Sequence, residues 1–386
     1  MPNNILKELL TQDQVLIDGN DLLHPVMEIL DKKESYFRQV LTKELSIELV
    51  NFISKHGDLD DDLSSAALKT STAFNVNQLP KSQTFNGDYD LLVNLKAIND
   101  TLQINQLFKS INQKLSLGGL VVGCVEPYQL RKARLLKKYP PILNWVYYTF
   151  DYLFKRVFPK LPILDKIYNY ITAGRNRAIS ETETLGRLNY CGFQVVNKLI
   201  DKNLLYFIAR KHEDTGEVKE KNYRVLLRLP RKGKGGKTIQ VYKLRSMFPY
   251  AEYIQQYMYE QNSLQKGGKF KDDFRISMIG RFFRKYFLDE LPMLLNLIKG
   301  DLKLVGVRPI SAQFFGLYSK ELQIKRVQYK PGLIPPYYAD LPNTMEEIQA
   351  SEMRYLKAYD KNKYLTDFRY FFMAMRNILF KMVRSK

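Results

Sequence analysis

Two kinds of hydrophobic pattern follow one another in the first half of the chain. Residues 1–65 place apolar residues three or four positions apart with acidic residues between them, which predicts two or three amphipathic helices. From residue 88 the order becomes an apolar run at 88–95, an amphipathic stretch at 104–115 and a second apolar run at 120–125. Strand, helix and strand in this order predict an α/β fold with a parallel sheet.

Residues 66–212 complete this predicted domain. Ser180 is followed three residues later by Glu183, which is the pattern of a capped helix N-terminus, and this helix is expected to end near Gly192. Strands at 193–196 and 204–209 then close the sheet. The polar segment 213–222 has few apolar anchors, so we interpret it as a linker before a second, mixed α+β domain at 223–386.

The second domain opens with the pattern of a β-hairpin. Apolar positions at 225–229 and 239–243 flank Gly235-Gly236, which predicts a tight turn between two strands that could direct Lys243 and Arg245 at a phosphate. Farther on, Pro292 favours the first turn of a helix that ends at Gly300, and an apolar strand follows at 302–305.

Composition indicates a folded protein with a polyanionic partner. The 386 residues are 45% hydrophobic and carry a formal net charge of +20, which excludes disorder. Residues 1–100 hold 9 basic and 16 acidic residues, 101–212 hold 18 and 6, and 213–386 hold 33 and 18. This excess favours nucleic acid, an anionic membrane surface or phosphorylated small molecules as partners.

Cysteine and histidine are scarce. Cys124, Cys191 and three histidines are too few for a disulfide framework or a zinc cluster, so we expect a reducing, cytoplasmic setting. The longest stretch without a charge, 139–150, has 12 residues, whereas a membrane-spanning helix needs about 20, so we expect no transmembrane helix and no secretory signal. The acidic cluster at 58–62 is interpreted as a loop or helix start, with a metal site as the weaker alternative.

An aromatic insertion at 131–178 interrupts the first domain. Its apolar run at 142–154 contains Trp145 and has basic residues on both sides, which suits either a lipid interface or packing on the domain core. The C-terminal helix has a similar stripe, for which core packing is favoured over membrane contact. The stripe consists of Phe368, Phe371, Phe372, Met375, Leu379 and Met382, flanked by Arg369, Arg376 and Lys381.

Chemistry in the second domain must rest on carboxylates, hydroxyls, Lys or Arg, because neither histidine nor cysteine follows His212. Asp289 and Glu290 stand at the predicted helix N-terminus near Arg281, Arg284 and Lys285, which should keep both carboxylates ionised. An ionised aspartate is a nucleophile without a general base, and the glutamate can bind Mg²⁺. The alternative is that both merely stabilise the helix. Arg308, before Pro309, fits a phosphate clamp or a surface turn.

Residues 223–332, and more loosely those up to 386, resemble the bacterial sugar transferase family, the monotopic polyprenyl-phosphate phosphoglycosyl transferases. The similar blocks are 243–247, 273–285, 288–292, 299–309 and 329–332. The resemblance implies that Asp289 attacks the pyrophosphate of a UDP-sugar, releases UMP and passes the phosphosugar to a polyprenyl phosphate. It also implies Glu290 as the Mg²⁺ ligand. Phosphate binding would fall to Lys243, Arg245, Arg281, Arg284 and Arg308.

This resemblance implies polysaccharide or glycolipid assembly at the cytoplasmic face of the inner membrane, alongside other glycan-assembly enzymes. The chain departs from the family where Tyr223-Arg224 replaces a Gly-Pro after a re-entrant helix, where Phe287 replaces Ser or Thr, and where Pro335 replaces Gly. We therefore expect peripheral membrane binding without the usual anchor. A non-catalytic scaffold is the alternative function. Nucleic-acid binding is not favoured, because the basic stretch 221–245 lacks interleaved aromatic residues.

Residues 88–211 resemble the second half of a class I methyltransferase domain. The similar blocks are 89–93, 115–120 and 185–193. That family binds its cofactor on a glycine-rich loop after the first strand, whereas only Gly19 and Gly57 occur before residue 87. We therefore expect a degenerate, structural domain without a bound cofactor.

Overall fold

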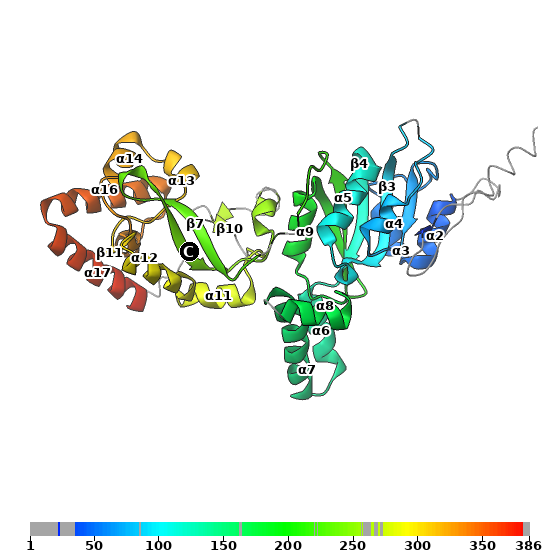
Figure 1. The fold of residues 1–386 in the computed structure, drawn as a ribbon, viewed down its shortest axis with the longest axis horizontal. Helices are drawn as coiled ribbons and strands as arrows, with labels where there is room; N and C mark the ends of the chain where they lie inside the picture. The colour runs from blue at the N-terminus through cyan, green and yellow to red at the C-terminus, as the bar shows by residue number, and fades with distance from the viewer. Residues whose placement is uncertain are drawn as a thin grey trace, which may run out of the picture. The chain divides into compact units, whose positions relative to one another are not determined.

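The computed structural model describes residues 22–23, 35–84, 86–161, 164–219, 221, 223–255, 257, 264–265, 269–270 and 273–380. The chain divides into two compact units (Figure 1). Unit 1 consists of Met1–Tyr223 with Pro249–Tyr257, and unit 2 of Arg224–Phe248 with Met258–Lys386.

Unit 1 is built on a sheet whose described strands follow the order β1-β2-β3-β4-β6-β5. The strands are β1 Leu22–Leu23, β2 Ser65–Leu68, β3 Tyr89–Ala97, β4 Leu115–Val125, β5 Phe193–Asp201 and β6 Leu204–Lys211. β2, β3 and β4 are parallel, whereas β6 runs antiparallel to both β4 and β5. The predicted α/β class with a parallel sheet is confirmed, and the resemblance to methyltransferases stays a prediction.

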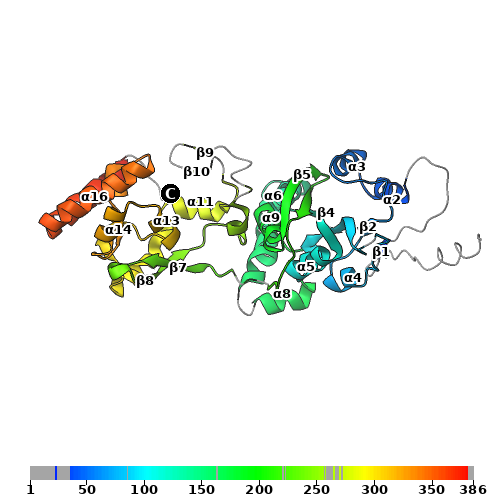
Figure 2. The same ribbon diagram turned by 90° about the horizontal axis from the view of Figure 1, so that it is seen from above.

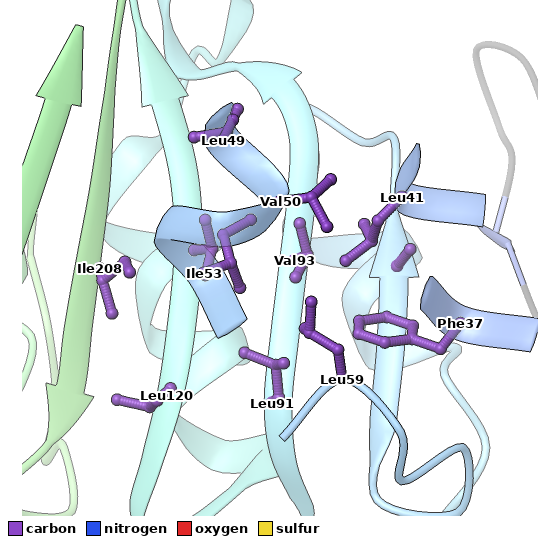
Figure 3. Close-up of a cluster of buried hydrophobic side chains, with 12 residues drawn as sticks. Phe37, Leu41, Leu49, Val50, Ile53, Leu59, Leu91, Val93, Leu120 and Ile208 are labelled. Carbon is purple, nitrogen blue, oxygen red and sulfur yellow. The ribbon is translucent and has the colours of Figure 1, made fainter. Parts of the chain in front are cut away.

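Helices cover both faces of this sheet (Figures 1 and 2). They are α2 Tyr36–Glu44, α3 Ile47–Ser54, α4 Ala73–Asn77, the 3₁₀ turn η1 Ile98–Asp100, α5 Ile104–Lys114 and α9 Glu181–Tyr190. Leu41 of α2 and Ile53 of α3 pack against Val93 and Ile208 in one buried cluster (Figure 3). Phe108 of α5 contacts Phe207 edge to face. Because consecutive strand residues face opposite sides, α5 covers the other face.

The acidic cluster at 58–62 holds the start of α2. Asp62 accepts hydrogen bonds from the backbone N–H groups of Tyr36 and Phe37, and Asp60 pairs with Arg38 at 2.9 Å. No group of three or more potential metal ligands occurs in the described part of the chain. The cluster itself lies in a loop, which is one of the two predicted alternatives, a loop or a helix start. Of the helices expected in residues 1–65, any part at 1–21 or 24–34 lies outside the described residues.

Two local predictions in unit 1 are tested by the backbone. Ser180 Oγ accepts a hydrogen bond from Glu183 N at 3.1 Å, so the predicted cap of α9 is confirmed. The strand expected at 120–125 instead begins at Leu115, directly after α5. The left-handed Gly118, with φ of 87°, lies where the pairing register with β3 shifts, and glycine accommodates this bulge without steric cost.

The aromatic insertion forms a helical subdomain that projects from the sheet domain (Figure 1). It comprises α6 Tyr128–Lys138, α7 Leu143–Tyr152, the π-helical turn η2 Leu153–Val157, the 3₁₀ turn η3 Phe158–Lys160 and α8 Leu164–Thr172. Residues 249–257 also belong to unit 1, where they include the 3₁₀ turn η5 Ala251–Ile254. Gly186 of α9 permits this packing, because a Cβ there would lie 2.2 Å from the carbonyl oxygen of Tyr250.

Unit 2 begins with the hairpin of β7 Leu226–Lys232 and β8 Thr238–Leu244, joined through η4 Lys234–Gly236, which confirms that prediction. Its other described elements are β9 Leu264–Gln265, β10 Lys269–Phe270, α11 Met278–Lys285, η6 Leu288–Met293, α12 Leu294–Ile298, β11 Lys303–Val305, α13 Ala312–Gly316, α14 Lys320–Arg326, β12 Gly332–Ile334, α15 Tyr337–Asp340, α16 Met345–Lys361 and α17 Lys363–Phe380. β11 and β12 pair in parallel.

The C-terminal helix α17 corrects one sequence interpretation. Its buried residues are Thr366, Ala374 and Asn377, whereas Phe368, Phe372 and Leu379 of the predicted core stripe are exposed. Asn377 donates to the carbonyl oxygens of Tyr338 and Ala339, so polar contacts with α15 decide which side faces inward. Met382 lies outside the described residues. Within those residues, no helix combines the length and the hydrophobicity that crossing a bilayer requires.

Candidate active site

Asp289 and Glu290 lie at the predicted helix N-terminus, in the first turn of the 3₁₀ helix η6, which continues directly into α12. Phe287 adopts a left-handed conformation with φ of 60° directly before this turn, and Glu290 N donates to its carbonyl oxygen at 3.1 Å. Pro292 lies inside the turn, and the α-helix α12 begins only at Leu294. Three residues of η6, at 291–293, therefore lie between the two carboxylates and the α-helix.

One buried asparagine ties this segment to the hairpin. Asn296 of α12 donates to the carbonyl oxygen of Gln240 at 2.6 Å and accepts from Tyr242 N at 3.0 Å, both in β8. The side chain is fully buried, and Asp301 accepts its other N–H at 3.1 Å. A buried amide with these partners fixes α12 against β8. It therefore sets the carboxylates beside Lys243, which follows Tyr242.

The two neighbouring carboxylates have different partners. Lys243 Nζ donates to Glu290 Oε1 at 2.7 Å. Asp289 is only 5% exposed, and its Oδ1 is buried with no hydrogen-bond partner in the part of the chain that the structure describes. Buried polar atoms are almost always hydrogen-bonded, and exceptions are characteristic of sites with a functional role. Asp289 Oδ1 therefore has no partner among the described residues, whereas Oε1 of the adjacent Glu290 is paired with Lys243.

Burial dominates the electrostatics of Asp289. Desolvation raises the pKa of this carboxyl above its ordinary value, and the Glu290 charge acts in the same direction, while Lys243 and Arg284 lower it. The expectation that nearby cations stabilise the ionised form is thus only part of the balance. The net shift is upward because the side chain is removed from water, which the sequence pattern did not reveal.

A cavity of about 120 Å³ lies against Glu290, whereas Asp289 is not among the residues that line it. Lys243, Glu290 and Arg308 line it together with Pro335 and Tyr338. Three of the predicted site residues are therefore brought to one concave surface. Pro335, one of the expected departures from the resembling family, forms part of the cavity wall.

The cavity also contains a residue that the sequence interpretation missed. Arg231 of β7 lines it, and Arg308 lowers the pKa of the Arg231 guanidinium after the larger effect of burial. Two guanidinium groups this close together are suited to an anion. A signal was available in the hairpin: Leu227 pairs with Lys243 and Arg231 with Ile239, so strand alternation places Arg231 and Lys243 on one face.

The other predicted phosphate ligands divide into two groups. Arg284 donates through Nε to Ser246 Oγ at 2.9 Å and interacts electrostatically with Asp289. Arg245 donates to the carbonyl oxygen of Arg224 at 3.0 Å, and Arg281 is exposed on α11. None of these three arginines lines the cavity. The structure thus brings Lys243 and Arg308 to the cavity with Glu290, keeps Arg284 near Asp289, and leaves Arg245 and Arg281 outside.

Close backbone contacts hold α11 in place. Ser277 caps α11 by accepting from Gly280 N at 2.9 Å, and Ser277 N donates to the Ser246 carbonyl oxygen at 3.0 Å. A Cβ at Gly280 would lie 1.8 Å from that same oxygen. Only glycine permits this approach. The contact keeps Arg284, one turn farther along α11, beside Ser246.

Comparison with known proteins finds relatives of the C-terminal half of this chain. The family model described as "Bacterial sugar transferase" matches residues 216–381. The galactosyl transferase CpsE of Streptococcus agalactiae is 41% identical over 105 residues, which are 27% of this chain and 23% of that protein. The UDP-glucose:undecaprenyl-phosphate glucose-1-phosphate transferase of Caulobacter vibrioides is 36% identical over 132 residues, 34% of this chain and 43% of that protein.

A third relative, the undecaprenyl-phosphate galactose phosphotransferase of Salmonella typhimurium, is 37% identical over 108 residues, covering 27% of this chain and 22% of that protein. The matched region thus spans less than half the length of each of these relatives. The family match contains the hairpin, the η6 carboxylates and the cavity. Residues 216–381 of this chain are similar to the bacterial sugar transferase family.

Proposed function

We propose that this chain transfers a sugar-1-phosphate from a UDP-sugar to a polyprenyl phosphate, through a covalent intermediate on Asp289. The observation that carries the proposal is the buried Oδ1 of Asp289, which has no hydrogen-bond partner among the described residues, beside the Lys243–Glu290 pair. Relatives whose names include undecaprenyl-phosphate sugar-phosphate transferases support this general reaction. A carboxylate oxygen without a hydrogen-bond partner in the described part of the chain is suited to form a bond with phosphorus.

The first step forms one bond and breaks another at a single phosphorus atom. Asp289 Oδ1 attacks the sugar-bearing phosphorus of the UDP-sugar pyrophosphate. The bond from that phosphorus to the bridging oxygen breaks, and UMP leaves with the electron pair. Arg231 and Arg308 line the cavity where phosphate oxygens would gain negative charge, and such fixed cations stabilise that charge without reorganising.

The second step regenerates the carboxylate. A phosphate oxygen of the polyprenyl phosphate attacks the same phosphorus, and its bond to Asp289 breaks. The product is a polyprenyl diphosphosugar, and no proton donor or redox partner is needed for this exchange. A histidine or cysteine is therefore not required, which agrees with the absence of both residues after His212 in the sequence.

The carboxylates of this site suit Mg²⁺, which the proposal includes as cofactor. Mg²⁺ prefers one or two carboxylates together with substrate phosphates and water, rather than a cage of protein ligands. Glu290 offers a carboxylate at the cavity surface, and the unpaired Asp289 oxygen lies on the adjacent residue. Glu290 would hold the ion, which when bound supplies positive charge to the pyrophosphate.

The surface next to the carboxylates is apolar, which supports a lipid as the acceptor substrate. Apolar side chains of α11, η6 and α12 are exposed around the site, which water-soluble substrates alone would not require. They are Met278, Ile279, Phe282, Leu291, Leu294, Leu295 and Ile298. The proposal therefore places unit 2 at the cytoplasmic face of the inner membrane, acting with other enzymes of polysaccharide or glycolipid assembly.

Isotope exchange tests the covalent step directly. The full chain is incubated with Mg²⁺, labelled UMP and a panel of UDP-sugars, without any lipid. We expect label to enter one UDP-sugar, because the first step is reversible and needs no acceptor. Adding polyprenyl phosphate should then release UMP and form a lipid-linked sugar phosphate.

Asp289→Asn should abolish both the exchange and the release of UMP. The matched control is Glu321→Gln, an exposed carboxylate on α14 in the same unit, which should retain activity. Full activity of Asp289→Asn would overturn the mechanism. Activity with lipid but no exchange without it would replace the covalent intermediate by direct transfer. If the native chain is inactive with every UDP-sugar of the panel, the alternative function as a non-catalytic scaffold is favoured.

A further inference from the structure

Helix α7 in the aromatic insertion buries its charged residue and exposes apolar side chains, which is the reverse of an ordinary surface helix. Its only charged residue, Asp151, is buried, and so is Tyr148. Its exposed side chains include Leu143, Trp145 and Phe150, the last of them 72% exposed. Soluble helices normally bury the apolar side and expose the charged one. The solvent-facing side of α7 therefore lacks charge altogether.

The apolar exposure continues on the neighbouring segments. We call the following exposed residues the insertion surface: Ile142, Leu143, Trp145, Val146, Phe150, Leu153, Ile167, Tyr170 and Ile171. Tyr170 of α8 is 92% exposed, and α8 lies against η2 through a ring contact between Tyr168 and Phe154. This set of residues, drawn from α7 with its N-cap, η2 and α8, exceeds the single exposed apolar residues that are normal on protein surfaces.

Buried ion pairs hold this surface rigidly on unit 1. Arg131 of α6 contacts both carboxylate oxygens of Asp151, at 2.6 and 2.8 Å. Arg156 of η2 pairs with Glu183 of α9 at 3.3 Å and donates to the Ala178 carbonyl oxygen at 2.6 Å. The polar side of each helix is thus satisfied within the domain, and these bonds fix the apolar side outward.

Positive charge surrounds the insertion surface. Residues 128–178 contain 11 Lys and Arg and two acids, and four of these cations, Arg131, Arg134, Lys155 and Arg156, are engaged in ion pairs. Lys132 lies over the Trp145 ring, with Nζ 4.9 Å from the ring centre. Lys137 and Lys138 are exposed at the end of α6, beside the turn into α7. Aromatic rings flanked by cations are the composition of segments that bind anionic lipid interfaces.

A hollow in the same subdomain adds an apolar recess. It has a volume of about 390 Å³ and is lined by Tyr147, Phe150, Leu153, Phe154 and Phe158, together with Lys155 and Asp151. Most of its lining is therefore hydrocarbon, with a cation close by. Such a recess is complementary to acyl chains below an anionic headgroup.

We infer that the insertion surface docks unit 1 on the interface of an anionic phospholipid bilayer. Trp145 and Phe150 enter the region between headgroups and acyl chains, while Lys132, Lys137 and Lys138 contact the anionic headgroups. The cationic surround decides for this occupant over a second copy of the chain, because two copies would bring two such positive surfaces together. The inference does not depend on the proposed reaction in unit 2.

The chain carries its own probe for this docking. Trp145 is the only tryptophan, and it is 53% exposed. The full chain is mixed with phosphatidylcholine vesicles that contain or lack phosphatidylglycerol, and the fluorescence emission is recorded. We expect a blue shift with the anionic vesicles and quenching by brominated acyl chains. The shift should weaken at high salt, because the headgroup contacts are screened.

Phe150→Glu tests the surface while keeping the tryptophan. We expect it to weaken binding to anionic vesicles by at least about tenfold, because it removes an inserted ring and adds a negative charge. Phe74→Glu is the matched control: Phe74 lies on α4 of the same unit, is 69% exposed, and the charge change is identical. This control should bind the vesicles like the native chain.

Three results would overturn the inference. Vesicle binding without any change in Trp145 emission would mean that another surface docks. Equal binding of Phe150→Glu and Phe74→Glu would mean that the insertion surface takes no part. Self-association that Phe150→Glu abolishes, with no response to anionic vesicles, would assign the surface to contacts between copies of the chain.

Discussion

Lys243 Nζ pairs with Glu290 Oε1 at 2.7 Å, and this bond distinguishes the two adjacent carboxylates of η6. Glu290 shares its charge with a lysine, whereas Asp289 keeps a buried oxygen without a partner in the described residues. The lysine also lowers the pKa of Asp289 through space, against the larger effect of burial. One lysine thus positions one carboxylate and tunes the other.

Lys243→Met should therefore change the pH dependence of the reaction as well as its rate. Without the cation the pKa of Asp289 rises further, so the acidic limb of the kcat/KM profile should move to higher pH. We expect roughly a 10²-fold loss of kcat, the usual effect of removing one preorganised charge. Lys243→Arg should recover part of the rate. A lowered rate with an unchanged acidic limb would contradict the tuning role.

Arg231→Met should raise the KM for the nucleotide sugar. A hydrogen bond to a charged group contributes about 1.5–3 kcal/mol, which corresponds to roughly a 10- to 100-fold increase. Arg228→Met is the matched control, because Arg228 lies on the same strand but on its opposite face, and is exposed. Steady-state kinetics of both variants provide the comparison. Similar KM values for the two would remove Arg231 from the site.

Gly280→Ala should disturb the site from a distance. The added Cβ would lie 1.8 Å from the Ser246 backbone oxygen, so α11 must shift and take Arg284 with it. Overpacking of this kind costs about 1–3 kcal/mol. Gly316→Ala meets nothing within 4 Å and should leave stability and activity near native. Denaturant unfolding and UMP release measure the two effects, and equal behaviour of both variants would refute this packing role.

Asp289→Asn should be more stable than the native chain at neutral pH. Because folding raises the pKa of Asp289, its protonated form fits the fold better than its ionised form. Its contribution to stability is fully present below the ordinary aspartate pKa of about 3.9 and is lost as the pH rises through the raised value. The difference in melting temperature should therefore disappear in acid. An equal or lower melting temperature at neutral pH would contradict this prediction.

The predictions that the structure confirms rest on short-range signals. The Ser180 cap and the turn at Gly235-Gly236 depend on a few neighbouring residues, so the local sequence suffices for both. The exposed stripe of α17 shows the limit of such signals. Helical spacing locates one apolar side, but hydrogen bonds from Asn377 to α15 select a different side for burial.

The site shows the same limit. Asp289, Glu290 and the cations Lys243, Arg284 and Arg308 could be selected from their blocks in the sequence. Arg231 was missed because it is one of many cations in the hairpin, and only its place in the cavity separates it from Arg228. The raised pKa of Asp289 was missed because the pattern of charged residues in the sequence does not show how far a side chain is removed from water.

The sequence by itself determined the α/β pattern of unit 1, the hairpin of unit 2 and the blocks that are similar to the bacterial sugar transferase family, because periodicity and turn chemistry act between near neighbours. The tertiary structure alone decided which carboxylate oxygen stays unpaired and which side of α7 faces outward. Both outcomes depend on partners far along the chain: Asn296 binds Gln240, and Asp151 binds Arg131. Burial and pairing are settled only when such distant residues meet.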